Sequence, residues 1–346
     1  MKKQYTQEEV QTEDSKDTPD AKIVGHLPHW QQAAKAEVDR LVSTGALEPV
    51  DTADLTDEQK TRIVSSTMAL KRKSDGRHKG RLCGRGFEAD AFYDDAPPSW
   101  SPCPRMSTVR IILTLIFSFT LKSFCADITQ AYTQSEMVDT LFISPPAFPI
   151  LSFLPSNYVW RVRRSLYGFR QAGHNWWKKL QHILSHDLGY KQSTYDPCLY
   201  FLPGCMCYVL FYVDDLLIVG TDAQIEAAVQ GLQRALPNSV TGSYGIRKYL
   251  GFRICEFTSH VIINASDFIR KCLNKFRIIG TSKIPWSSVL TPRADSELKV
   301  DQSLYRSIIG SLTWIATIAR PDISAVTHHP ASFSHDPCRR HLEAAS

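Results

Sequence analysis

Residues 208–220 read Tyr-Val-Leu-Phe-Tyr-Val-Asp-Asp-Leu-Leu-Ile-Val-Gly, two apolar runs with a pair of carboxylates between them. Short apolar runs of this length, bounded by a turn signal, are typical of buried strands. The pattern predicts a strand, a tight turn at Asp214-Asp215 and a second strand. Adjacent carboxylates in a partly dehydrated place repel each other, and Mg2+ is the natural partner for their oxygen atoms. An ordinary Asp-rich turn is the alternative, which this stretch alone favours.

A further carboxylate ends another predicted strand. Phe124-Cys125-Ala126 is a short apolar run, and Asp127 follows it directly. If the two strands are neighbours in one sheet, Asp127 reaches the same metal ions as Asp214. Two ions about 3.5–4 Å apart are the arrangement that supports in-line phosphoryl transfer. The alternative is that Asp127 caps a following turn.

Composition limits the class of protein. The 346 residues are 43% hydrophobic and 22% charged, which excludes disordered, collagen-like and coiled-coil chains. The net charge of +5 permits a nucleic-acid partner without establishing one. Nine cysteines without a Cys-x-x-Cys pair argue against a disulfide framework and a zinc ribbon. The longest uncharged run, Ile111 to Leu121, is too short to span a membrane, which takes about 20 residues.

Local patterns predict the remaining elements. Residues 1–22 are polar and are expected to form a disordered tail. The basic stretch from Met68 to Phe87 is expected to be a hairpin that turns at Asp75-Gly76, with Leu82 and Cys83 as candidate inward positions, or else a solvated charged face. We expect one helix from about residue 28 and another from Thr108 or Val109, with Ser107 as its cap. Further helices are expected over 175–188 and 223–235, and the chain from 267 onward is expected to be mainly helical. Strands are expected over 159–162 and 249–255.

Nine short motifs occur in one order along most of the chain: KGRLCGRGF at 79–87, DITQAY at 127–132, PPAF at 145–148, VWRV at 159–162, SLYGFRQA at 165–172, DPCLY at 196–200, YVDD at 212–215, YLG at 249–251 and RPDI at 320–323. Their order resembles that of the reverse transcriptase of copia-type long-terminal-repeat retrotransposons. The resemblance covers residues from about 28 to about 325. Two stretches, 165–172 and 320–323, disfavour a group II intron-like or host-type polymerase.

The resemblance implies an α+β right-handed polymerase, with an antiparallel palm sheet backed by helices. It places the fingers at about 23–105 and 134–172, the palm at about 106–133 and 173–263, and the thumb at about 264–346. In contrast to the relatives, we expect no ribonuclease H, integrase or protease domain in this chain. The implied activity is RNA-directed DNA polymerisation, in which deoxynucleoside triphosphates extend a primer on an RNA or DNA template. The alternative is a catalytically silent or truncated remnant that only binds nucleic acid or other element proteins.

The resemblance also assigns the catalytic residues. Asp127, Asp214 and Asp215 match the catalytic carboxylates that hold two Mg2+ ions. The backbone carbonyl of Ile128 would complete one metal shell. Tyr132 matches the residue beneath the sugar of the incoming nucleotide.

The resemblance assigns the rest of the nucleotide and primer contacts as well. Tyr167 and Gly168 match the strip on which the base and sugar rest. Lys79 and Arg81 match the cations that face the triphosphate, with Lys71 and Lys73 as alternatives. The segment Tyr249-Leu250-Gly251 resembles the part that holds the primer end.

The resemblance implies a place in the cell and partners too. It implies that the protein is located in the cytoplasm, in the virus-like particle of the element, with possible access to the nucleus and no membrane association. Self-association and association with other retroelement proteins are both possible on this basis.

Where many relatives have proline, this chain has Gly173, which favours a looser loop there. His182 and His186 have zinc-like spacing, but the missing third ligand favours a structural role. Trp176 and Trp177 are expected to be core residues.

Overall fold

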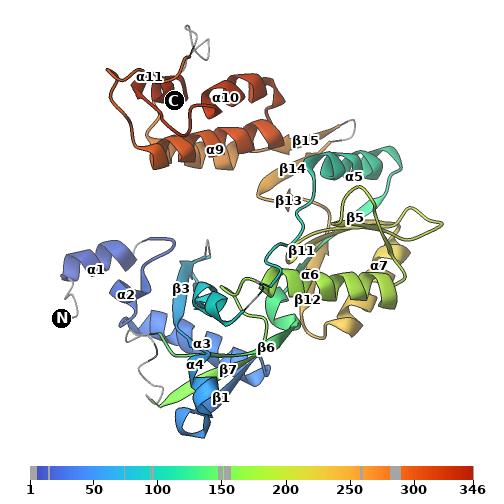
Figure 1. The fold of residues 1–346 in the computed structure, drawn as a ribbon. Coiled ribbons are helices and arrows are strands. Elements are labelled where there is room, and N and C mark those ends of the chain that lie inside the picture. The colour runs from blue at the N-terminus through green and yellow to red at the C-terminus, as the bar shows by residue number, and fades with distance from the viewer. Residues whose placement is uncertain are drawn as a thin grey trace.

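The structure is a computed structural model that describes residues 6–14, 16–73, 75–93, 95, 97–146, 151, 157–257, 260–280 and 290–345. Within these residues the fold is mixed α and β, with four separate sheets. Figure 1 shows the blue N-terminal elements at the left and the bottom, α6 and α7 at the right, and the red C-terminal helices at the top. The general part of the predicted fold class, helices and several sheets in one chain, is confirmed.

The central sheet has the strand order β12-β5-β11-β10-β9-β8, and every neighbouring pair is antiparallel. Its strands are β5 (Lys122–Ile128), β8 (Lys191–Gln192), β9 (Leu199–Phe201), β10 (Tyr208–Tyr212), β11 (Asp215–Gly220) and β12 (Val240–Tyr244). Every residue of β11 after Asp215 is buried, as expected for an apolar run without alternation. The strand, turn and strand predicted over 208–220 are confirmed.

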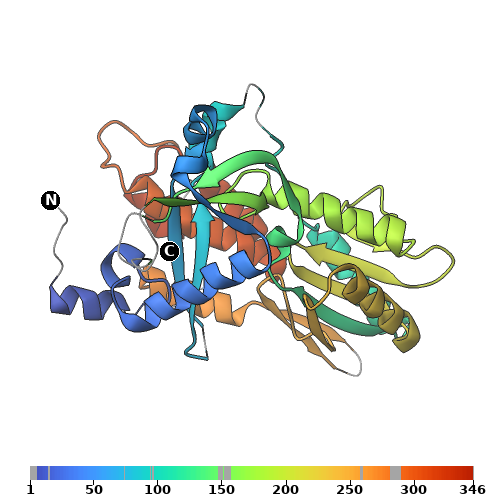
Figure 2. The ribbon, with the colours of Figure 1, turned by 90° about the horizontal axis from the view of Figure 1, so that it is seen from below.

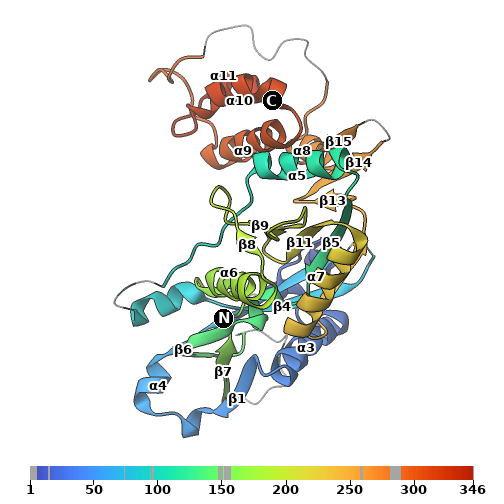
Figure 3. The ribbon, with the colours of Figure 1, turned by 90° about the vertical axis from the view of Figure 1, so that its right-hand side faces the viewer.

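Helices α5 (Met106–Ser118), α6 (Ala172–His182) and α7 (Asp222–Ala235) pack against the central sheet. The last turn of α6 runs into a π-helical turn, η5 (Ile183–Asp187), which contacts α7. Figure 3 shows α6 and α7 side by side. The predicted helices over 175–188 and 223–235 are therefore confirmed, with shifted ends.

A second sheet joins segments that are far apart in the sequence. Its strand order is β1-β7-β6-β2, with β1 (Leu47–Asp51), β2 (Ile63–Val64), β6 (Glu136–Ile143) and β7 (Tyr158–Arg164). The pair β2 and β6 is parallel, and the other two pairs are antiparallel. The short elements around it are α1 (Gln7–Asp14), α2 (Ala21–Val24), η1 (Thr52–Asp54), α4 (Asp57–Thr61), η2 (Gly86–Phe92) and η3 (Ala131–Gln134).

The long helix α3 (Pro28–Ser43) lies against a hairpin of β3 (Ser66–Arg72) and β4 (His78–Gly84), which it crosses in Figure 2. Strand pairing runs from Ser66 opposite Gly84 to Arg72 opposite His78, so the predicted basic hairpin is confirmed. Leu82 is buried as expected. Its neighbour Cys83 is only partly buried, because adjacent strand residues face opposite sides.

The C-terminal part begins with a three-stranded sheet of β13 (Lys248–Tyr249), β14 (Phe252–Glu256) and β15 (Val261–Asn264). The helical elements that follow are α8 (Ser266–Phe276), α9 (Gln302–Ile318), η6 (Pro321–Ile323), α10 (Ser324–Ala331) and α11 (Arg339–Ala345). The mainly helical end that the sequence predicts is confirmed. In the described part of the chain, no helix is long and apolar enough to cross a membrane.

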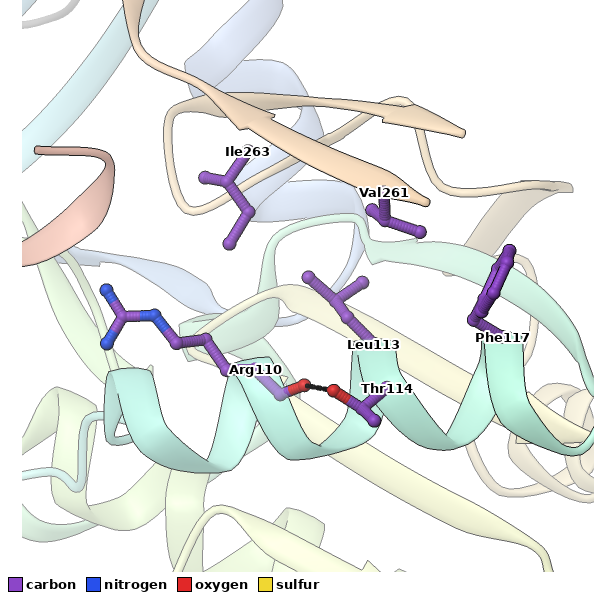
Figure 4. A pocket seen from close by; sticks show the side chains of 6 residues that line it. All are labelled: Arg110, Leu113, Thr114, Phe117, Val261 and Ile263. Atoms are coloured by element: carbon purple, nitrogen blue, oxygen red, sulfur yellow. Dashed lines mark hydrogen bonds between the residues drawn. The ribbon is translucent and has the colours of Figure 1, made fainter. Parts of the chain in front are cut away.

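A groove lies between α5 of the central part and β15 of the C-terminal part. Figure 4 shows its lining residues, which are Arg110, Leu113, Thr114, Phe117, Val261 and Ile263. A guanidinium nitrogen of Arg110 donates a 2.6 Å hydrogen bond to the carbonyl of Thr317, near the C-terminal end of α9. A cation at this position complements the negative end of a helix dipole. The groove contains none of the predicted site residues.

The predicted disordered tail is the first correction. The structure has helices α1 and α2 within residues 6–14 and 16–24, while residues 1–5 and 15 lie outside the described part. The Asp14 carboxylate accepts a 2.6 Å hydrogen bond from Trp30 Nε1 and lies 3.0 Å from His29 Nε2. These partners lie in α3, so the polar composition of the segment did not reveal them.

Two further predictions are wrong in detail. The strand predicted over 249–255 is two strands, because Leu250 and Gly251 have φ of +47° and +86° and turn the chain between β13 and β14. The helix predicted to start after a Ser107 cap begins at Met106 instead. Arg105 holds the cap position there without a side-chain cap bond.

Candidate active site

The sheet register brings the predicted carboxylates together. Asp127, the residue before the last in β5, lies directly opposite Asp215, the first residue of β11. Directly opposite residues of an antiparallel pair project from the same face of the sheet. Asp214 lies in the adjoining turn, where its carbonyl accepts a 2.9 Å hydrogen bond from the N–H of Ile128. The alternative role of Asp127, as the cap of a following turn, does not fit its place inside a paired strand.

Val213 determines the backbone conformation of the turn between β10 and β11. This residue has φ of +54°, a left-handed conformation that β-branched residues rarely adopt. Its carbonyl accepts a 2.7 Å hydrogen bond from Nε1 of Trp176 in α6. Trp176 and Trp177 are buried in the core, as the sequence predicts. The helix behind the sheet therefore fixes the turn that carries Asp214.

The three carboxylates disturb one another electrostatically. Loss of hydration and the charge of Asp214 raise the pKa of Asp127. Loss of hydration and the charges of Asp214 and Asp127 raise the pKa of Asp215, which Lys248 partly opposes. None of the three forms an ion pair with another described residue. Negative charge is thus concentrated at this end of the sheet without a protein cation in contact.

Cations line the same cavity of about 400 Å3 as Asp127 and Asp214, whereas Asp215 does not border it. Its walls come from the central sheet, the basic hairpin, the strip after β7 and helix α3. They are formed by Asp127, Ile128, Thr129, Gln130, Asp214, Lys71, Lys73, Lys79, Arg81, Tyr167, Glu37 and Arg40. The structure therefore brings Lys79 and Arg81, and also Lys71 and Lys73, to the same cavity as Asp127 and Asp214.

The hairpin and the strip at Tyr167 are joined through glycine backbone. The N–H of Gly84 donates to the carbonyl of Tyr167 at 2.9 Å, and the N–H of Gly86 donates to that of Gly168 at 3.2 Å. Gly168 has φ of +92°, and a Cβ there would lie 2.0 Å from the carbonyl oxygen of Gly84. Only glycine fits this approach. The Arg81 guanidinium lies 5.1 Å from the ring centre of Tyr167.

Tyr132 lies beside this strip without lining the cavity. Its ring packs edge-on against Tyr167, with 5.0 Å between the ring centres. Burial and the charge of Asp214 raise the pKa of the Tyr132 hydroxyl, so this side chain is close to the turn that carries Asp214. Gln130, two residues earlier, has φ of +55° and turns the chain into η3.

The predicted primer contacts are separate from the cavity. Tyr249 is buried, and its hydroxyl donates a 3.3 Å hydrogen bond to the carbonyl of Leu210 in β10. Leu250 and Gly251 form the turn between β13 and β14. The structure joins this segment to the central sheet beneath the carboxylates, and not to the cavity walls.

A comparison with protein families identifies the chain. A model described as "Reverse transcriptase (RNA-dependent DNA polymerase)" matches residues 52–287, which is most of the chain and includes all three carboxylates. The chain belongs to the reverse transcriptase family. The resemblance to copia-type retrotransposon enzymes is confirmed.

Relatives of this reverse transcriptase are parts of longer retrotransposon proteins. The chain is 29% identical over 287 residues to the retrovirus-related Pol polyprotein from transposon RE1 of Arabidopsis thaliana, covering 79% of this chain and 19% of the relative. It is 27% identical over 310 residues to that from transposon TNT 1-94 of Nicotiana tabacum, covering 82% and 22%. That from transposon RE2 of Arabidopsis thaliana is 26% identical over 328 residues, covering 91% and 22%. The chain spans about a fifth of the length of these relatives.

Sequence reasoning missed four residues of this reverse transcriptase cavity, one of which, Thr129, directly follows Ile128. Glu37 and Arg40 come from α3, and Gln130 comes from the segment between Asp127 and Tyr132. With its amide oxygen facing α3, Gln130 accepts from Nε of Arg40 at 2.9 Å and from its terminal nitrogen at 3.1 Å. One signal was present: Glu37 and Arg40 lie one turn apart on an amphipathic helix, and Glu37 falls within its apolar stripe.

Other candidates do not gather into a site. Among the described residues, no group of three or more histidine, cysteine or acidic side chains is arranged to hold a metal ion as it stands. His182 and His186 stack with 4.6 Å between ring centres. All nine cysteines are free. Ala147 and Phe148 of the PPAF motif lie outside the described residues.

Proposed function

We propose that this chain is the RNA-directed DNA polymerase of a copia-type retrotransposon, which adds deoxynucleotides to the 3′-end of a primer on an RNA or DNA template. One observation carries the proposal. Asp127 lies opposite Asp215, with Asp214 in the adjoining turn, and Asp127 and Asp214 face a cavity whose far wall is cationic. Carboxylates opposite cations across a cavity suit a triphosphate with its metal ions.

The architecture supports the assignment of a right hand. The central antiparallel sheet with α5, α6 and α7 corresponds to the palm, at about 106–133 and 173–263. The second sheet and the basic hairpin correspond to the fingers, at about 23–105 and 134–172. The helices α8 to α11 correspond to the thumb, at about 264–346. On this assignment the cavity lies between palm and fingers.

The carboxylates fit Mg2+. Carboxylate oxygens are hard ligands, and burial together with the charge of Asp214 raises the pKa of Asp127 and of Asp215. Asp127, Asp214 and Asp215 would hold two ions, with the backbone carbonyl of Ile128 as a further ligand. Bound there, Mg2+ supplies positive charge that stabilises the attacking and departing oxygens of an in-line displacement.

The remaining residues bind and orient the nucleotide. Lys79 and Arg81 bind the triphosphate oxygens, and Tyr167 with Gly168 supports the base and sugar, above Tyr132. The primer 3′-oxygen forms a bond to the α-phosphorus, the bond between the α- and β-phosphates breaks, and diphosphate leaves while the hydroxyl proton passes to solvent. The segment from Tyr249 to Gly251 orients the primer end, through the attachment of Tyr249 to β10. Lysine and arginine side chains hold the duplex by its phosphates.

The purified full chain tests this proposal in a primer-extension assay. With an oligo(dT) primer on poly(rA), dTTP and Mg2+, the proposal expects a ladder of extended primers that chelation abolishes. A chain that binds the primer–template but extends none of it, at any Mg2+ concentration, would show that it is a silent nucleic-acid-binding remnant.

A further inference from the structure

The active-site cavity adjoins a second cavity. We call the active-site cavity the front chamber and the second cavity the rear chamber. The rear chamber measures about 320 Å3 and lies between α3 and the turn end of the basic hairpin. Glu37, Arg40, Lys73 and Lys79 border both chambers. The two chambers thus share a wall that is mainly cationic.

The shared wall is built around Arg40. Its guanidinium donates to the Glu37 carboxylate and to the side-chain oxygen of Gln130. Glu37 is only 4% exposed, so this arginine compensates a buried charge. No hydrogen bond joins the second terminal nitrogen of Arg40 to a described residue. A guanidinium has five N–H donors, and those of this nitrogen remain for a ligand.

The rear chamber carries more positive than negative charge. Glu37 is the only acidic residue among its described walls, and Arg40 pairs with it. Arg77 pairs with Asp75, outside the chamber. Lys73 and Lys79 form no ion pair with a described residue, and partial burial together with Arg81, Lys73 and Arg40 lowers the pKa of Lys79. Nε2 of His78 is also buried here, without a hydrogen-bond partner among the described residues. Crowded cations of this kind favour a bound anion.

We propose that the rear chamber is a second phosphate-binding site, which takes the diphosphate released in the front chamber. The inference rests on the proposed function, because that reaction is the source of the diphosphate. Lys73 and Lys79 border both chambers, so the anion can pass between them while it stays in contact with cations. The transfer is a movement of the product and breaks no further bond.

The chain offers substitutions that affect only the rear chamber. Ala33, Ala36, Arg77, His78 and Gly80 line it without bordering the front chamber. Ala36 is exposed on α3, where glutamate is a good helix former, so Ala36→Glu adds a negative charge without disturbing the fold. Ala227→Glu, on the exposed face of α7, is the matched control for the same substitution elsewhere.

Calorimetric titration of inorganic diphosphate into the full chain, without nucleic acid or divalent cations, tests the inference. We expect Ala36→Glu to weaken diphosphate binding about tenfold, which corresponds to one repulsive charge at short range. Ala227→Glu should bind diphosphate like the wild type. Arg77→Gln should weaken binding in the same direction as Ala36→Glu, by a smaller factor. Circular dichroism and melting temperatures check that all three variants are folded.

A front-chamber variant separates the two sites. Arg81 borders only the front chamber, so Arg81→Gln should raise the KM for dTTP and leave diphosphate binding within about twofold of wild type. Ala36→Glu should weaken diphosphate binding and leave the KM for dTTP close to that of the wild type. Unchanged diphosphate affinity in Ala36→Glu would overturn the inference. A loss confined to primer–template affinity and its salt dependence would also overturn it, because the chamber would then hold nucleic acid.

The two proposals fail in distinguishable ways. Calorimetry needs no catalysis, so a wild type that binds diphosphate in the rear chamber but extends no primer contradicts the polymerase function and leaves an anion site. A wild type that extends primers while its diphosphate binding ignores Ala36→Glu and Arg77→Gln contradicts the rear chamber alone.

Discussion

Nε1 of Trp176 donates a 2.7 Å hydrogen bond to the main-chain carbonyl of Val213. Trp176 is buried in the helix behind the sheet, and Val213 precedes Asp214 in a left-handed turn conformation. The bond compensates a strained position that a β-branched residue would otherwise avoid. Trp176 is therefore a positioning residue for the turn that carries Asp214.

Trp176→Phe keeps an aromatic ring but removes the indole donor. We expect it to cost about 1–3 kcal/mol of unfolding free energy, and to slow single-turnover nucleotide incorporation about tenfold or more while primer–template affinity is retained. The control is Trp177→Phe, since Trp177 is also buried but does not hydrogen-bond to Val213. Equal slowing in both variants would show that loss of packing, and not the bond to Val213, is responsible.

Gly168→Ala tests the close approach between the hairpin and the nucleotide strip. The new Cβ would meet the carbonyl oxygen of Gly84 at 2.0 Å, in addition to the strain of φ +92°. Gly189→Ala is the control, because Gly189 has φ of +73° and a Cβ added there would have no atom within 4 Å. Urea unfolding should give about 1 kcal/mol for Gly189→Ala and clearly more for Gly168→Ala, together with a raised KM for dTTP. Equal costs would refute the clash.

The raised pKa of Asp127 predicts a pH-dependent stability. A carboxyl whose pKa is raised above its ordinary 3.8 in the folded state binds its proton more tightly there than in the unfolded chain. Its contribution to stability is therefore present at low pH and is lost as pH rises through the folded pKa. In metal-free buffer, the stability of Asp127→Asn relative to wild type should increase as pH rises from about 4 toward neutral. The gain should be about 1 kcal/mol or less, because solvent screens the exposed charge.

Thermal unfolding of both proteins across this range measures the effect. Asp222→Asn, at an exposed position on α7, is the control for a lost carboxylate elsewhere. A difference between Asp127→Asn and wild type that stayed constant with pH would show that burial and the charge of Asp214 do not raise the pKa of Asp127.

Tyr132 is expected to select the sugar. Its ring packs on Tyr167, so a phenol there would occupy the space that a ribose 2′-hydroxyl needs. Tyr132→Ala should raise the efficiency of ribonucleotide incorporation relative to deoxyribonucleotide, whereas Tyr132→Phe should keep the wild-type ratio. If Tyr132 is only a core aromatic, truncation costs about 3–5 kcal/mol and harms both substrates alike. Incorporation of both nucleotides, measured beside melting temperatures, distinguishes the two roles.

Patterns within a short window predicted the elements that carry the chemistry. The apolar runs around Asp214 and the Asp75-Gly76 turn signal each specify a local structure whose side chains are nearby in the sequence. The ordered motifs then supplied the family. The opposition of Asp127 and Asp215 could not be derived in this way, because strand register depends on contacts between segments that are distant in the chain.

The errors have the same physical origin. The Asp14 carboxylate contacts Trp30 and His29, which lie further along the chain. The polar composition of the N-terminal segment does not reveal contacts with residues that distant. Leu250 has φ of +47°, a conformation that leucine rarely adopts. In the sequence, only Gly251 therefore indicated a turn after Tyr249. Arg40 enters the cavity only because α3 crosses the basic hairpin, which is a property of the assembled fold.

The most direct test of the account is the rate of single-nucleotide incorporation by Asp127→Asn under saturating primer–template, dTTP and Mg2+. Asparagine keeps the shape of the side chain and removes the charge that holds Mg2+. The account predicts loss of incorporation by at least about a thousandfold, with primer–template affinity close to wild type and with Asp222→Asn fully active. Incorporation by Asp127→Asn at near wild-type rate would contradict the assignment of the carboxylates at the ends of β5 and β11 as the catalytic centre.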